Sequence, residues 1–219
     1  ARFAGATLPM TATQLGKVST NGHLEGTLDD LQANLRLKAL GASTKIKGTI
    51  SRLLNGPSVN LHVSLKHPEL SIFARKFAPS YRPPVRKLGP LDASATLQGN
   101  LESLQTDLRL KALGASTRVK GPISRLSSEP SANLRVSLKH PEVSSFVRKF
   151  VPSYRPAARK LGLLDASATL RGDAKAFAIE KLDLKAGPVA ATGTFKGTLA
   201  GKRHKFDLDL KTNEVLLGQ

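Results

Sequence analysis

The sequence lacks several kinds of residue that would otherwise point to a function. It contains no cysteine and no tryptophan, and only 5% of its 219 residues are aromatic. Without cysteine there is neither a disulfide scaffold nor a cysteine-based metal or catalytic site. No run of about 18 apolar residues occurs, and the opening segment ARFAGATLPM lacks the charged and apolar regions of a signal peptide. We therefore expect neither a membrane-spanning helix nor a cleaved leader in this sequence.

Acidic residues are also scarce relative to basic ones. The chain has 34 Lys and Arg against 16 Asp and Glu, which gives a formal net charge of +18. Such an excess favours anionic partners such as nucleic acid, a phospholipid surface or lipopolysaccharide, without choosing among them. Hydrophobic residues make up 40% of the chain, mostly as Leu, Val and Ala, so we expect a folded, β-rich protein.

An internal repeat of 73 residues is the most prominent feature that is present. Residues 24–96 and 97–169 align without a gap and differ at only 21 of 73 positions. A third, diverged copy follows, in which FAIEKLDLK and TGTFKGTL echo earlier segments with small insertions. The sequence therefore divides into the end of a preceding repeat (1–23), repeat unit A (24–96), repeat unit B (97–169) and a partial, diverged repeat (170–219). We expect this sequence to be part of a longer array of such repeats.

Each unit contains four segments in which apolar and polar residues alternate. In the second unit these segments are LDASATLQ from residue 91, LQTDLRLKA from 104, the stretch 115–123, and SANLRVSLK from 131. A period of two indicates a strand that buries one face. Leu113-Gly114 is a turn signal, and the connections are short enough for antiparallel hairpins.

The period changes after the fourth segment. In PEVSSFVRKFV, the residues that recur at helical spacing are Val143, Phe146, Val147 and Phe150. Pro141 suits the first helical position, and Glu142 suits the positive end of the helix dipole. Pro152 should end this short helix, after which a basic crossover leads to the next strand.

These patterns predict a mainly β fold with short helices (α+β). We expect tandem repeats of four antiparallel strands plus one helix, which together form an elongated, curved β-sheet groove. One helix is roughly 10 Å wide whereas four strands span about 19 Å, so the helices can cover only part of an apolar sheet face. The remainder needs a curled sheet, a partner or an apolar ligand.

The repeat also resembles a known family. The segments LKHPELSIFARKF, KLGPLDASATLQG and LGASTKIKG, each with a second copy, are similar to the pattern of the AsmA-like proteins of Gram-negative bacteria. The resemblance implies bridge-like lipid transfer: a long β-groove in the periplasm that carries phospholipid acyl chains toward the outer membrane. It also implies an inner-membrane anchor in a segment absent from this chain. The chain is more basic than we would expect of such a conduit.

Our leading hypothesis is a non-enzymatic conduit for phospholipid or another lipid. The apolar residues expected to line it are Leu35, Leu37, Val63, Leu65, Leu108, Leu110, Val136 and Leu138. The alternative is a structural or interaction repeat whose apolar face is fully covered and which binds a membrane, lipopolysaccharide or another polyanion. In either case further repeats of the same array are expected partners.

A basic crossover is the best polar candidate in each unit. Its residues are Arg75, Lys76, Arg82, Arg86 and Lys87 in the first unit and Arg148, Lys149, Arg155, Arg159 and Lys160 in the second. They could meet phosphate headgroups at a groove rim or membrane surface, or form a solvated connection that keeps the array soluble. Tyr81 and Tyr154 are the only tyrosines, and no strand presents aromatics for base stacking, so we expect no specific nucleic-acid function.

No catalytic, metal or cofactor site is expected. His67-Pro68-Glu69, repeated at residues 140–142, brings an imidazole near a carboxylate, but its recurrence in each unit favours a turn between strand and helix. GTLAGKR fails as a phosphate loop because its glycines are too close and Arg203 replaces the required Ser or Thr. No Gly-x-Ser-x-Gly elbow occurs, and the five histidines lack zinc-site spacing. We therefore expect that the protein is not an enzyme.

Overall fold

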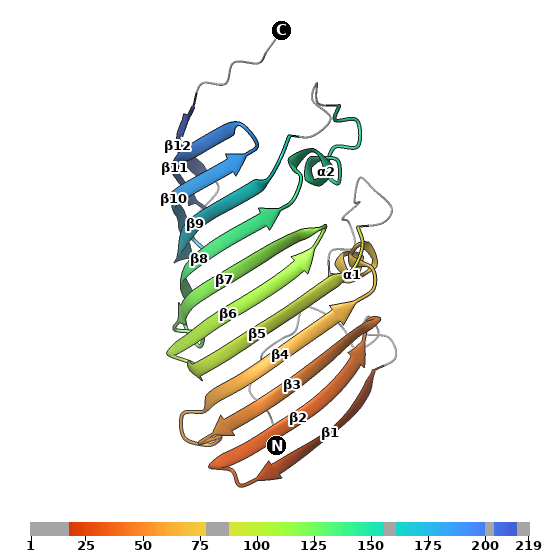
Figure 1. The fold of residues 1–219 in the computed structure, drawn as a ribbon. Coiled ribbons are helices and arrows are strands. Elements are labelled where there is room, and N and C mark those ends of the chain that lie inside the picture. Colours follow the sequence, from red (N-terminus) through yellow and green to blue (C-terminus); the bar gives the residue numbers. More distant parts are fainter. Residues whose placement is uncertain (1–17, 78–87, 156–160, 200–203, 214–219) are drawn as a thin grey trace.

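The chain forms one long antiparallel sheet, seen in a computed structural model that describes residues 18–77, 88–155, 161–199 and 204–213. The sheet is open and has twelve strands whose order in space is their order in sequence. Figure 1 shows this layer running from β1 to β12, with both helices along one edge. The strands are β1 (Ser19–Gly26), β2 (Asp30–Ala39), β3 (Ala42–Ser51), β4 (Ser58–His67), β5 (Leu91–Asn100), β6 (Ser103–Ala112), β7 (Ala115–Ser124), β8 (Ser131–His140), β9 (Leu164–Asp173), β10 (Ala176–Ala186), β11 (Val189–Thr198) and β12 (Lys205–Thr212). The expected mainly β class with antiparallel strands and short helices is confirmed.

Two-residue turns join β2 to β3 and β6 to β7. Ala39 pairs with Ala42, so Leu40 and Gly41 alone form the first of these turns. Their φ angles are +57° and +80°, the left-handed values that a type I′ hairpin requires at both positions. The Leu-Gly pair between β6 and β7 has nearly the same angles, +59° and +81°. The Leu-Gly signal in the sequence therefore marks a tight hairpin.

The two helices are α1 (Leu70–Phe77) and α2 (Val143–Val147), and each follows a strand that ends in histidine. The prediction that proline occupies the first helical position is wrong. α2 begins two residues after Pro141, and Glu142 is its N-cap, with a carboxylate that accepts a hydrogen bond from Ser144 N. Proline sets the strand exit, and the carboxylate of the next residue caps the helix.

The helices lie in connections that return the chain to an adjacent strand. β4 and β5 pair along their whole length although α1 lies between them in sequence, and β8 and β9 pair in the same way around α2. Both connections leave from the same end of the strands (Figure 1). We call this side of the sheet, where β4 and β8 end at His67 and His140, the helix edge. The described helices therefore sit beside the sheet rather than across it.

A β-bulge absorbs the insertion in the third copy. β10 has 11 residues where β2 and β6 have 10. Its pairing with both neighbours shifts between Ile179 and Asp183, and Lys181 has a φ of +51°. Because one residue is left unpaired, Leu182 and Leu184 return to the face on which Ile179 lies.

Few apolar side chains are fully buried in this single layer. Those buried among the described residues are Ala33, Ala42, Leu88, Leu91, Ala115, Val143 and Ala191. Most of them lie at the helix edge, where His67, Ser71, His140 and Ser144 are buried as well. The packed core of the described chain is therefore small and concentrated along that edge.

Glycines within β3 and β7 allow neighbouring backbones to approach closely. Gly48 and Gly121 have φ angles of +138° and +149°. A Cβ atom built on either glycine would overlap a carbonyl oxygen on the next strand, that of Asn60 or Asn133. The last glycine of each LGAST-x-x-x-G segment is thus required by both conformation and space.

Replacing Gly121 with alanine should destabilise the protein by about 1–3 kcal/mol, because the added methyl group meets backbone and the φ angle disfavours it. Thermal unfolding followed by circular dichroism measures this. Gly56→Ala is the matched control, since Gly56 also has a positive φ, +72°, but an added Cβ would meet nothing within 4 Å. Equal losses in the two variants would contradict the close-approach explanation.

Candidate functional site

Apolar side chains line up across the sheet in continuous rows. Strand pairing places one row through Leu35, Ile46, Val63, Ala95, Leu108, Val119, Val136 and Ala168. The next row contains Leu37, Thr44, Leu65, Ala93, Leu110, Thr117, Leu138, Ala166, Leu184 and Ala191. Because side chains alternate along a strand, both rows lie on one face. This apolar face crosses nearly the whole sheet.

All eight residues predicted to contact lipid belong to these two rows. Each of the eight is half-buried, including Leu108 and Val136 near the middle of the sheet. The structure thus brings them together on one face, while their contact with lipid stays a prediction. Ile46 and Val119 lie in the same row but are not among the eight predicted residues, although the alternation of their strands marks them equally well.

No described element packs across the middle of the apolar face. Strands contact mainly their neighbours in the sheet, and the helices make few contacts with any strand. Toward the C-terminal end, Phe195 stacks on Phe206 with ring centroids 5.9 Å apart, and Phe206 is 60% exposed. The described chain therefore presents more apolar surface than it covers. Surfaces of this kind commonly mark a binding site.

The helix edge is held together by two buried histidines. His67 Nε2 donates to Leu40 O at 3.1 Å, and His67 Nδ1 accepts from Glu69 N at 3.0 Å. Because a carbonyl oxygen only accepts and a backbone N–H only donates, these partners require the tautomer with its proton on Nε2. The ring of Phe73 lies 5.2 Å from that of His67. His140 repeats the contacts, accepting from the next glutamate N–H at 3.0 Å and meeting a phenylalanine of α2 at 5.2 Å.

Glu69 joins α1 to the start of β5. Its Oε1 accepts from Ser71 N at 3.1 Å, Ser71 Oγ at 2.9 Å, Leu88 N at 2.8 Å and Gly89 N at 3.2 Å. Burial by itself raises the pKa of this carboxyl, but the four donors together outweigh it and lower the pKa. Both imidazole nitrogens of His67 and one carboxylate oxygen of Glu69 are thus engaged in structural hydrogen bonds.

Glu142 makes equivalent hydrogen bonds in the second copy, and we call Glu69 and Glu142 the clamp glutamates. It accepts from Ser144 N, Ser144 Oγ and Leu161 N at 3.2, 2.9 and 2.9 Å. The Leu161 N–H is the main cause of its lowered pKa, against an opposing effect of burial. Sequence analysis missed this role, although both copies carry a serine two residues after the glutamate.

The predicted headgroup-binding cations are only partly described. Arg75 in α1 and Arg148 after α2 are exposed, whereas Lys149 is half-buried. Arg155 is engaged locally, since its Nη1 donates to Pro152 O at 2.8 Å. The side chain of Lys76 and the whole of Arg82, Arg86, Lys87, Arg159 and Lys160 lie outside the described residues.

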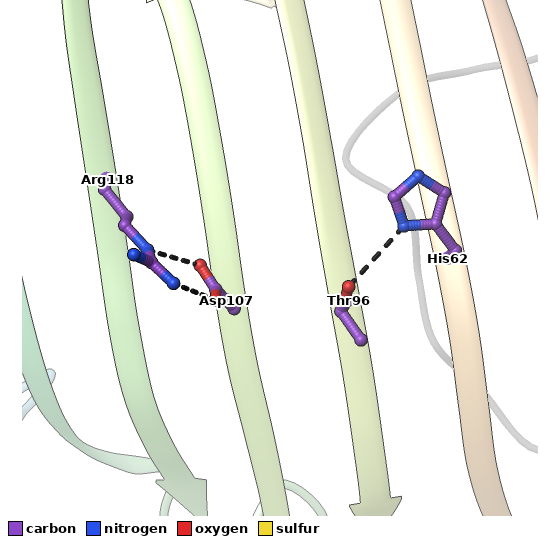
Figure 2. Close-up of polar contacts among 4 residues, drawn as sticks. All are labelled: His62, Thr96, Asp107 and Arg118. Atoms are coloured by element: carbon purple, nitrogen blue, oxygen red, sulfur yellow. Dashed lines mark hydrogen bonds and ion pairs between the residues drawn. The ribbon is translucent and has the colours of Figure 1, made fainter.

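The opposite face of the sheet is polar. Figure 2 shows two of its cross-strand contacts, His62 with Thr96 and Arg118 with Asp107. Arg118 Nε donates to Asp107 Oδ1 at 2.9 Å, and this bond is the main cause of the lowered pKa of Asp107. His62 Nδ1 lies 3.5 Å from Thr96 Oγ1, a weaker contact. One face of the sheet is therefore apolar and the other carries the charges.

An apolar cleft at one end of the strands does not lie over the predicted lipid positions. It has a volume of about 780 Å³ and is lined by the ends of β5 to β9, including Ala112, Ala115, His140 and Leu164. None of the eight predicted residues lines it. The apolar rows form an open face rather than an enclosed cavity.

No family model matches the chain, and no curated protein or solved structure matches it either. In residues 18–77, 88–155, 161–199 and 204–213, no helix is long and apolar enough to cross a bilayer. In the same ranges no three His, Asp or Glu side chains gather in a group that could hold a metal ion. The two contrasting faces of the sheet are therefore the features on which function is proposed.

The clamp glutamates should make stability depend on acid. Their lowered pKa values mean that their contribution is complete above the ordinary glutamate value of 4.5 and is lost as pH falls through the folded-state value. The double variant Glu69→Gln, Glu142→Gln should unfold several degrees lower than the parent at neutral pH, and the two melting temperatures should converge as the pH falls below 4.5 and through the folded-state value. Melting temperatures measured across this range test this. Glu102→Gln, at an exposed position, should leave the dependence of melting temperature on pH unchanged. If the curve of the double variant ran parallel to that of the parent at every pH, the stabilising role of the clamp glutamates would be contradicted.

Proposed function

We propose that this chain is a segment of a non-enzymatic lipid-transfer conduit whose apolar face carries phospholipid acyl chains between the membranes of a Gram-negative envelope. The observation that supports it most is the unbroken apolar face, which the described helices leave uncovered. A hydrocarbon chain is the natural cover for such a face, because its burial requires no polar partner. The resemblance of the repeat to AsmA-like proteins supports the same function and a periplasmic location.

In this proposal each 73-residue unit adds four strands and one helix to an elongated, curved groove. The chain gains length by repetition, and further units of the array would extend the face beyond β1 and β12. Neither of these terminal strands has a second neighbour in the described sheet. Leu208 of β12 is 62% exposed on the apolar side, which supports continuation of the face past this end.

Headgroups would remain at the rim of the groove in this arrangement. The helix edge carries the exposed cations Arg75 and Arg148, at equivalent positions of the two copies. Cations of this kind attract lipid phosphates. Acyl chains would slide over Leu and Val side chains, with no residue performing chemistry.

A second candidate function is a structural repeat that binds anionic surfaces. The net charge of +18 favours it. This second function requires a closed sheet whose apolar face is fully covered. The described sheet is open, so the conduit is the better-supported proposal.

Lipid extraction of the purified protein, followed by mass spectrometry, tests the conduit. The parent protein should carry phospholipid. The double variant Leu108→Asp, Val136→Asp should retain at least about fivefold less, because two carboxylates on the apolar face must be desolvated beside hydrocarbon. Transport between donor and acceptor vesicles should fall in parallel.

Gln105→Asp is the control, since residue 105 lies on β6 but faces the opposite side from Leu108. It adds one carboxylate and should leave lipid content unchanged. Circular dichroism shows whether each variant retains its strands. A parent protein without lipid, or a folded double variant with full lipid content, would contradict the conduit.

A further inference from the structure

The polar face of β2 and β3 carries four cations without acidic partners. Arg36 and Lys38 lie on β2, and Lys45 and Lys47 lie on β3. All four are exposed, and none forms an ion pair or a side-chain hydrogen bond within the described ranges. We call these four residues the β2–β3 quartet.

Strand pairing brings like charges together in this quartet. Arg36 lies directly opposite Lys45. Directly opposed like charges destabilise a sheet, so this arrangement is unfavourable unless an anion lies over it. The neighbouring Lys66 differs, because it pairs with Asp92 at 3.2 Å.

At one position each later copy has an acidic side chain that contacts an arginine, and the first copy does not. In the second copy Arg109 opposes Arg118, but Asp107 binds Arg118. In the third copy Glu180 lies 3.5 Å from Arg171. At the corresponding position the first copy has Asn34, which carries no charge.

The charge of the polar face also changes along the sheet. β10 and β12 place Asp183, Asp207 and Asp209 on this face, among the cations Lys185 and Lys211. The face is thus strongly cationic at β2–β3 and mixed at β10–β12. This asymmetry provides an internal reference for any binding that depends on charge.

The quartet is arranged to meet a surface rather than a pocket. Neighbouring strands are about 4.8 Å apart and alternate residues about 6.8 Å apart, so the four cations form a small two-dimensional array. The phenylalanines of the sheet, Phe177, Phe195 and Phe206, all lie on the apolar face. Among the described residues, the polar face beside the quartet therefore carries no phenylalanine, and its nearest rings are the imidazoles of His23 and His62.

We propose that the β2–β3 quartet is a docking surface for an anionic phospholipid bilayer. The array would neutralise several headgroup phosphates at once, and the repulsion between Arg36 and Lys45 would be relieved on contact. Each cation near an anionic bilayer strengthens binding by roughly fivefold. The surface lies on the opposite face from the proposed acyl-chain path, so the two activities are separable.

Co-sedimentation with vesicles tests this, using phosphatidylcholine with and without about one third phosphatidylglycerol. The parent protein should bind only the anionic vesicles, and less at high salt. The variant Arg36→Gln, Lys38→Gln, Lys45→Gln, Lys47→Gln should bind roughly several hundredfold more weakly. Asn34→Asp, which copies the second unit, should weaken binding about fivefold without affecting the fold.

The matched control removes the same total charge elsewhere on the polar face: Lys185→Gln, Lys196→Gln, Lys205→Gln and Lys211→Gln. It should bind anionic vesicles within about threefold of the parent. Equal losses in both quadruple variants, or full binding by the β2–β3 variant, would overturn the proposal. Binding of the parent to duplex DNA but not to vesicles would overturn it in favour of nucleic acid. Lipid content of the purified β2–β3 variant should match the parent, so failure here is distinguishable from failure of the conduit.

Discussion

The register of strand pairing determines which side chains share a face, and every other property of the sheet depends on it. A shift of one residue in any strand would send its leucines to the polar face and its lysines to the apolar face. The register is held without a shift from β2 to β9, and β10 shifts by one residue against both of its neighbours. In β10 the extra residue is expelled as a bulge, so the alternation survives the insertion. The separation of an apolar and a charged face is therefore maintained even where the repeat has diverged.

The devices that maintain this register are local and recur in both complete copies. Leu-Gly turns fix the hairpins, and mid-strand glycines allow close approach of β3 to β4 and of β7 to β8. In the first copy His67 and Glu69 tie a strand end, a hairpin turn and a crossover together, and Glu142 repeats the tie to the crossover in the second. Because a single-layer sheet has little buried core, these hydrogen bonds are important for positioning its strands. The two open faces remain available for ligands.

Much of this fold could be predicted from sequence because its period is simple. Alternation located the strands of the second unit to within two residues at each end, and the Leu-Gly pair located a turn. The eight apolar positions share a face because hairpins join the strands within each unit and because β4 and β5 pair in register across the connection that contains α1. Helix starts were less accessible, since Pro141 suited a first helical position but lies before the cap that Glu142 provides. The clamp by Glu69 was hidden because its partner Leu88 lies 19 residues away, across the crossover. The opposed cations of the β2–β3 quartet could not be predicted either, because only the strand register shows that Arg36 faces Lys45.

The proposed conduit requires that hydrocarbon cover the apolar face and not the polar one. Since the chain has no cysteine, single cysteines at Val136 and at Arg135 can carry a polarity-sensitive fluorophore on adjacent, opposite-facing positions of β8. Addition of phospholipid to the delipidated protein should shift the emission of the dye at 136 to the blue and leave that at 135 unchanged. Equal responses at the two positions, or none at 136, would contradict the account.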